Sequence, residues 1–254
     1  MTPTYRPSAT KLVAAFIILF ALYQSAEGVG ARLLDSGLVA NVLMLSALLA
    51  APMVSRWLGF GWLGAYALDL RRGVGWTVLA GLVAAGAAKM LALLVGAQLG
   101  LYAISPADAM APQAALLAIT GALIVTAVPS MAEDILTRGF WLRASGIRWT
   151  AAAFIFATSA IYLLNHIYRL GEGPIEWLRL FCFGLAYAAA AWRWKTLWAA
   201  FGLHWGWNLS NVLLDMFVRV DTAAPAHGAL ISAGAHLVIA ALILAMPARR
   251  SSDV

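Results

Sequence analysis

Residues 113–143 read QAALLAITGALIVTAVPSMAEDILTRGFWLR, an apolar run that is long enough to span a membrane and carries charges near its end. A spanning helix needs about 20 mostly apolar residues. Each charged side chain placed in hydrocarbon costs about 2.5–3.5 kcal/mol or more. Glu133, Asp134 and Arg138 stand within six positions. The segment therefore predicts a membrane helix whose charges serve a site or a structural ion pair.

The composition is that of an integral membrane protein. Of the 254 residues, 63% are hydrophobic and 11% are charged, whereas soluble domains carry about 25% charged residues. We expect a single integral-membrane domain over residues 1–254. We assign the net charge of +6 to basic loops that orient the chain in the bilayer, and not to nucleic-acid binding. The single cysteine, Cys182, excludes a disulfide within the chain and a cysteine-based zinc site.

Hydropathy predicts an all-α fold, a polytopic membrane helical bundle of about eight transmembrane helices. The loops between the apolar runs are short, so neighbouring helices should pack antiparallel. The predicted spans are 12–30, 37–58, 74–101, 113–143, 150–169, 175–193, 196–218 and 228–247.

The distribution of basic residues predicts the orientation. With both termini in the cytoplasm, eleven Lys and Arg residues fall on the inside and four on the outside. Arg6, Arg249 and Arg250 contribute to the inside total, while Arg138 and Lys89 are intramembrane. This asymmetry fits the positive-inside rule. We therefore expect a multi-pass protein of the bacterial inner membrane with cytoplasmic termini.

Polar residues inside the fourth and fifth spans are candidates for a site. Asp134 and Arg138 are four residues apart and can pair on one helix face. Glu133 points elsewhere, and one arginine cannot satisfy both carboxylates. The fifth span carries Asn165-His166. A buried ion pair that locks two helices and a core histidine bonded to a backbone carbonyl are the structural alternatives.

The seventh span carries a polar stripe. His204, Asn208, Asn211 and Asp215 lie within roughly 60° of one another at 100° per residue. Such a stripe must face protein or water. An interhelical hydrogen-bond seam or a water-lined channel is the alternative to a reaction site.

The candidate residues can reach similar depths and suit hydrolysis. At 1.5 Å per residue, Glu133, His166, His204 and Asn208 lie about 12–25 Å above the cytoplasmic helix ends. Glu133 can take a proton from water that His166 positions. His204 and Asn208 can donate hydrogen bonds to the oxyanion. A second possibility is a divalent metal such as zinc on Glu133, His166 and His204. A site without a cofactor and a site with a divalent metal are thus the two alternatives.

Three motifs in order resemble those of the CPBP family of intramembrane proteases, which includes the type II CAAX prenyl endopeptidases and bacteriocin-immunity relatives. The family pattern of Glu-Glu-x-x-x-Arg, Phe-x-x-x-His and His-x-x-x-Asn or Asp corresponds to three segments of this chain. The resemblance covers roughly residues 113–218, spans four to seven. Asp134 replaces the second glutamate and Tyr162 replaces the phenylalanine. The segments are Glu133-Asp134-x-x-x-Arg138, Tyr162-x-x-x-His166 and His204-x-x-x-Asn208.

The resemblance implies an intramembrane endopeptidase with Glu133 as the base, acting on a membrane-anchored protein or peptide within the lipid bilayer. Glu133, His166, His204 and Asn208 would be catalytic, and Asp134, Arg138 and Tyr162 supporting. Alternatives are an inactive binding or immunity scaffold of the same family and a solute or proton pathway. Structural roles are expected for four further residues. These are His227 in a loop, His236 in a lipid-facing or packing position, and Glu27 and Lys89 as snorkelling side chains or a mutual salt bridge.

Overall fold

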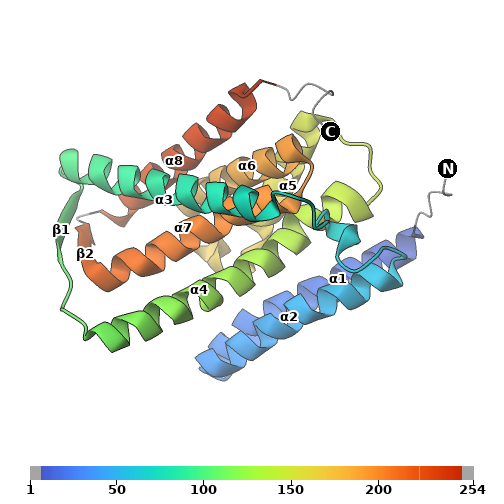
Figure 1. The fold of residues 1–254 in the computed structure, drawn as a ribbon, viewed down its shortest axis with the longest axis horizontal. Coiled ribbons are helices and arrows are strands. Elements are labelled where there is room, and N and C mark those ends of the chain that lie inside the picture. Colours follow the sequence, from blue (N-terminus) through green and yellow to red (C-terminus); the bar gives the residue numbers. More distant parts are fainter. Residues whose placement is uncertain (1–6, 223, 248–254) are drawn as a thin grey trace.

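The computed structural model describes residues 7–222 and 224–247, and their chain forms a bundle of α-helices (Figure 1). Arg6, Arg249 and Arg250, which contribute to the predicted orientation, lie outside these residues. The helices are α1 (Ala9–Ser25), α2 (Gly37–Trp57), α3 (Val74–Gln98), α4 (Pro112–Asp134), α5 (Ala151–Asn165), α6 (Pro174–Trp194), α7 (Leu197–Phe217) and α8 (Pro225–Ala245).

Two of these helices continue as π-helix. The segment η1 (Ala26–Leu33) extends α1, and η3 (Ile135–Ala144) extends α4. The shorter 3₁₀ turns η2 (Gly64–Tyr66) and η4 (Ile167–Glu172) lie in connecting segments. The wider π-helical turn is rare and is often found at functional sites. Here it begins directly after Glu133 and Asp134.

The long apolar helices confirm an all-α membrane bundle. Within the part of the chain that the structure describes, five helical stretches are long and apolar enough to cross a membrane. Of the other three helices, α5 has only 15 residues, while α6 and α7 have 21 residues each but are less apolar. The five stretches are Ala9–Leu33, Gly37–Trp57, Val74–Gln98, Pro112–Ala144 and Pro225–Ala245.

A small antiparallel ribbon is absent from the sequence-based prediction. Strands β1 (Tyr102–Pro106) and β2 (Val218–Thr222) pair at one end of the bundle, with Tyr102 opposite Thr222 (Figure 1). Strand β2 directly follows α7, and residues 99–101 separate β1 from α3; these two helices pack side by side. The predicted third span ended at residue 101, directly before β1, and the predicted seventh span ended at residue 218, the first residue of β2.

Helix α7 lies between α3 and α4 and also packs on α6 (Figure 1). Its contact with α3 is close because glycines remove side chains from both helices. A Cβ atom added to Gly81 would lie 2.7 Å from the backbone carbon of Gly202, and one added to Gly206 would lie 2.7 Å from the Cα of Leu82. Small residues allow such approaches between membrane helices. Since residues two apart project to opposite sides of a helix, His204 faces away from α3.

Candidate active site

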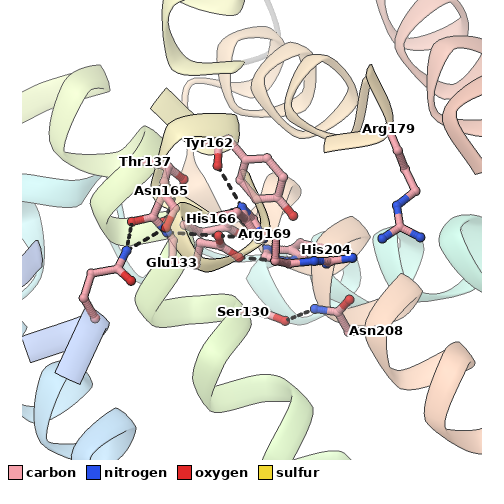
Figure 2. A network of polar contacts seen from close by, with 12 residues as sticks. Ser130, Glu133, Thr137, Tyr162, Asn165, His166, Arg169, Arg179, His204 and Asn208 are labelled. Atoms are coloured by element: carbon pink, nitrogen blue, oxygen red, sulfur yellow. Dashed lines mark hydrogen bonds and ion pairs between the residues drawn. The ribbon is translucent and has the colours of Figure 1, made fainter. Parts of the chain in front are cut away.

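Glu133 is the centre of a buried polar cluster. It stands near the end of α4 and is 5% exposed. Its Oε1 accepts a hydrogen bond from the side-chain amide of Asn165 at 3.1 Å and lies 3.4 Å from Nε2 of His166. Its Oε2 lies 3.5 Å from Nε2 of His204. Figure 2 shows these side chains converging from α4, the end of α5 and α7.

Hydrogen bonds at the other ring nitrogens orient both histidines. Nδ1 of His166 lies 2.8 Å from the backbone carbonyl oxygen of Tyr162. Nδ1 of His204 lies 3.2 Å from Oδ1 of Asp134. A carbonyl and a carboxylate only accept, so each Nδ1 carries a hydrogen. Both Nε2 atoms therefore face Glu133, where a proton can be held or exchanged.

Asp134 and Arg138 form the predicted ion pair. Both side chains are 0% exposed, and Nη1 of Arg138 bonds to Oδ1 of Asp134. Arg138 also donates to Oγ1 of Thr137 at 3.0 Å. Its guanidinium carbon lies 4.5 Å from the ring centre of Tyr162 and 5.0 Å from that of Tyr187. The bond from Asp134 to His204 was not predicted, and it links the ion pair to the cluster around Glu133.

The sequence analysis also missed two amide side chains. The amide of Asn165 donates to Glu133, and Gln24 of α1 donates to the backbone oxygen of Asn165 at 2.6 Å and to its Oδ1 at 3.0 Å. Both are buried. The position of Asn165 directly before His166 of the second motif could have indicated that it belongs to the site. Gln24 is an isolated amide in an apolar helix and belongs to no sequence motif that would indicate a role.

Asn208 lies beside this cluster without a hydrogen bond to Glu133. One N–H of its amide donates to Oγ of Ser130 at 3.0 Å (Figure 2). Ser130 lies on α4, three residues before Glu133, and is fully buried. The second N–H of Asn208 is therefore the candidate donor to a bound group. Asn211 continues the stripe as a half-buried residue, and Asp215 at its end is exposed.

The end of α5 places His166 near Glu133. The predicted fifth span ran to residue 169, but α5 ends at Asn165 and His166 leaves helical geometry with φ −83° and ψ 51°. The His166 ring then donates a hydrogen bond to the backbone carbonyl of Tyr162, near the end of the helix. The four-residue spacing of the second motif thus produces a local bond that orients the imidazole.

The four further residues for which structural roles were expected lie outside the polar cluster around Glu133. Glu27 pairs with Arg32 at 2.8 Å and so does not bridge to Lys89. The Lys89 ammonium lies 5.1 Å from the ring centre of Trp207. His227 is exposed, as expected for a loop residue, although it belongs to the first turn of α8. His236 is fully buried in helix packing and does not face lipid.

A groove of about 1100 Å³ between α3, α7 and α8 does not contain the cluster. Its lining is mainly small and apolar, and includes Gly81, Ala84 and Leu203 but none of the motif residues. Within residues 7–222 and 224–247, no group of three or more His, Cys, Asp or Glu side chains is arranged to hold a metal ion.

Comparison with known families agrees with the motifs. Neither the curated proteins nor the solved structures yielded a match. Residues 113–210 match the family model described as type II CAAX prenyl endopeptidase Rce1-like. This range contains every residue of the three motifs and supports a protease that works in the membrane. The segment that builds the polar cluster is therefore similar to the Rce1-like type II CAAX prenyl endopeptidases, the family that the sequence motifs resemble.

Proposed function

We propose that the protein is an intramembrane endopeptidase in which Glu133 activates water. The observation that carries this proposal is the buried Glu133 carboxylate, which faces two imidazole Nε2 atoms and the Asn165 amide. No arginine or lysine in the described residues pairs with it. A carboxylate without a permanent cationic partner is suited to exchange protons.

The reaction can be written with the residues of this cluster. Glu133 takes a proton from a water molecule that His166 positions, and the water oxygen attacks the scissile carbonyl carbon. The resulting oxyanion accepts hydrogen bonds from the Nε2–H of protonated His204 and from the free N–H of Asn208. The Asp134 carboxylate at Nδ1 stabilises the charge on His204. Glu133 then delivers the proton to the leaving nitrogen as the C–N bond breaks.

The metal alternative keeps the same residues. If a divalent ion such as zinc binds, Glu133, His166 and His204 are the residues that would hold it, and the ion would polarise the carbonyl or the water. We favour the metal-free reaction because Glu133 faces two imidazoles with which it can exchange protons; the bond from Asn165 to Oε1 is compatible with either reaction. Metal analysis of the purified protein, with activity measured before and after chelator treatment, distinguishes the two.

We propose a membrane-anchored protein or peptide as the substrate, reached within the bilayer. The cluster lies in a bundle whose described residues include five helical stretches long and apolar enough to cross a membrane, and the loops between the helices are short. The basic loops favour a bacterial inner-membrane protein with both termini in the cytoplasm. The family name suggests a substrate with a CAAX-type carboxyl terminus, with or without a prenyl group.

The test uses the purified protein in liposomes with quenched fluorescent peptides that end in a CAAX box, in prenylated and unprenylated forms. Glu133→Gln should lower kcat about 10²–10⁴-fold, the range for loss of a general base. Glu172→Gln is the matched control, because Glu172 is a half-exposed glutamate paired only with Arg169. Equal cleavage by wild type and Glu133→Gln would refute the assignment. Peptide binding without cleavage by the wild type would instead indicate a binding protein.

A further inference from the structure

Tyr187 of α6 contacts two residues of the polar cluster although it belongs to none of the three motifs. Its side chain is 0% exposed. The ring stacks on the imidazole of His204 with centroids 4.8 Å apart and planes 23° apart. The Arg138 guanidinium carbon lies 5.0 Å from the same ring centre. The position of Tyr187 therefore limits how the imidazole of His204 can tilt.

His236 of α8 holds the hydroxyl of Tyr187. Its Nε2 lies 3.0 Å from the Tyr187 hydroxyl, and its Nδ1 lies 2.8 Å from the backbone carbonyl oxygen of Ser232. The carbonyl can only accept, so Nδ1 carries a hydrogen. In the neutral ring Nε2 is then an acceptor, and the Tyr187 hydroxyl donates to it.

The surroundings of His236 favour this neutral acceptor. The ring is 0% exposed, stacks on Phe183 at 3.6 Å between centroids, and meets the edge of Trp207 at 4.3 Å. The charged or titratable groups that act on it electrostatically are His204, Lys89 and Arg179, and none of these is an acid. A buried imidazole in an aromatic pocket is unfavourable unless its nitrogens are hydrogen-bonded. Both nitrogens are bonded here.

We propose that Tyr187 and His236 are positioning residues for His204. The hydrogen bond from its hydroxyl to His236 fixes the Tyr187 ring, and this ring stacks on the imidazole of His204, which faces Glu133. The inference rests on the proposed function for its kinetic effect, but the arrangement itself can be measured without activity. Residue 236 lies outside the segment 113–210 that matches the family, so this positioning device is assigned from the structure of this chain.

The kinetic test compares His236→Phe, Tyr187→Phe and the double variant. His236→Phe fills the pocket but leaves the Tyr187 hydroxyl without its acceptor, so the ring must move and kcat should fall about 10–100-fold with KM within about twofold. Tyr187→Phe keeps the stacked ring and should lower kcat about three- to tenfold. The double variant should match Tyr187→Phe alone, because residues in one hydrogen-bonded unit are not additive.

His227→Phe is the matched control, because His227 is an exposed histidine of the same helix and should retain wild-type kcat. Independent, multiplying losses in the double variant would show that His236 acts only through packing. Wild-type kcat in His236→Phe, with the fold intact by thermal unfolding, would also overturn the proposal.

Nitrogen-15 NMR of histidine-labelled protein tests the arrangement apart from cleavage. The chain has four histidines, so single substitutions assign the signals. We expect His236 to show a protonated Nδ1 and an unprotonated Nε2, and Tyr187→Phe to shift its Nε2 signal. His236→Phe should shift the signals of His204 and leave those of His227 unchanged. Unchanged His204 signals would overturn the proposal, whereas a protein with these signals but no cleavage would refute only the proposed function.

Discussion

Glu133 and Asp134 are adjacent in the chain, but their carboxylates have different kinds of partner. Asp134 is fully buried, pairs with Arg138 and accepts a bond from Nδ1 of His204. Glu133 has no arginine or lysine partner among the described residues and meets one amide, two imidazole Nε2 atoms and the hydroxyl of Tyr23. One acid is neutralised by a permanent cation, and the next is surrounded by groups that can gain or lose a proton.

This difference teaches how two acids can share a small volume inside a membrane. A buried charge is tolerated when a fixed opposite charge and hydrogen bonds offset its desolvation. Arg138 supplies the opposite charge for Asp134, although Oδ2 of Asp134 and the Nε and Nη2 atoms of Arg138 have no hydrogen-bond partner among the described residues. Asp134 also accepts a hydrogen bond from His204, whose ring contacts both acids. Glu133 depends on His204, His166 and Asn165, so its protonation state can change during a reaction. Breaking the contacts of Asp134 should therefore have different consequences from breaking those of Glu133.

The largest effect should come from removing the cation beside Asp134. Arg138→Met leaves a fully buried carboxylate without its partner, and should lower the free energy of unfolding by about 3–5 kcal/mol. Thermal unfolding in detergent measures this. The control is Arg32→Met, which breaks the half-exposed Glu27–Arg32 pair and should cost less than about 1 kcal/mol. Similar losses in both variants would show that Arg138 does not stabilise Asp134.

Removing the amide beside Glu133 should affect activity more than stability. Asn165→Ala takes away a hydrogen bond to a carboxylate, worth about 1.5–3 kcal/mol, so kcat should fall about 10–100-fold. The measurement is the kcat of peptide cleavage in liposomes. Asn41→Ala, at an exposed asparagine of α2, is the control. Unchanged kcat in Asn165→Ala would mean that the amide does not orient Glu133.

The parts of the site that could be predicted from the sequence are those whose residues lie close together in the chain or within a motif. A four-residue interval predicts the Asp134–Arg138 pair, and motif order predicts that His166 and His204 belong to the same site. The hydrogen-bond partners of Gln24 and His236 could not be predicted, because they are 141 and 49 positions away in the chain. The β1–β2 ribbon was missed because pairing of two loops depends on how α3 and α7 pack. Helix boundaries followed hydropathy except where polar contacts ended α5 at Asn165.

Restoring the glutamate of the family motif tests how closely Asp134 fits. Asp134→Glu adds a methylene where the side chain is 0% exposed and contacts both Arg138 and His204. Overpacking of this kind costs about 1–3 kcal/mol, and it should displace His204 and lower kcat. Unfolding and kcat are measured on the same preparation. A stability and kcat equal to the wild type would show that the pocket accepts either acid and that the shorter residue is not matched to it.

The smallest effect should come from Gln24, which reaches Glu133 only through Asn165. Gln24→Leu removes the donor to the backbone oxygen and the Oδ1 atom of Asn165. Neutral hydrogen bonds contribute about 0.5–1.5 kcal/mol, so kcat should fall about two- to tenfold. Gln98→Leu, at an exposed glutamine near the end of α3, is the control. In the Asn165→Ala background the Gln24→Leu change should have no further effect on kcat, because the residue it positions is gone. A further, independent fall in kcat in that background would show that Gln24 acts on the reacting groups directly. The group of residues around Glu133 would then include a residue of α1.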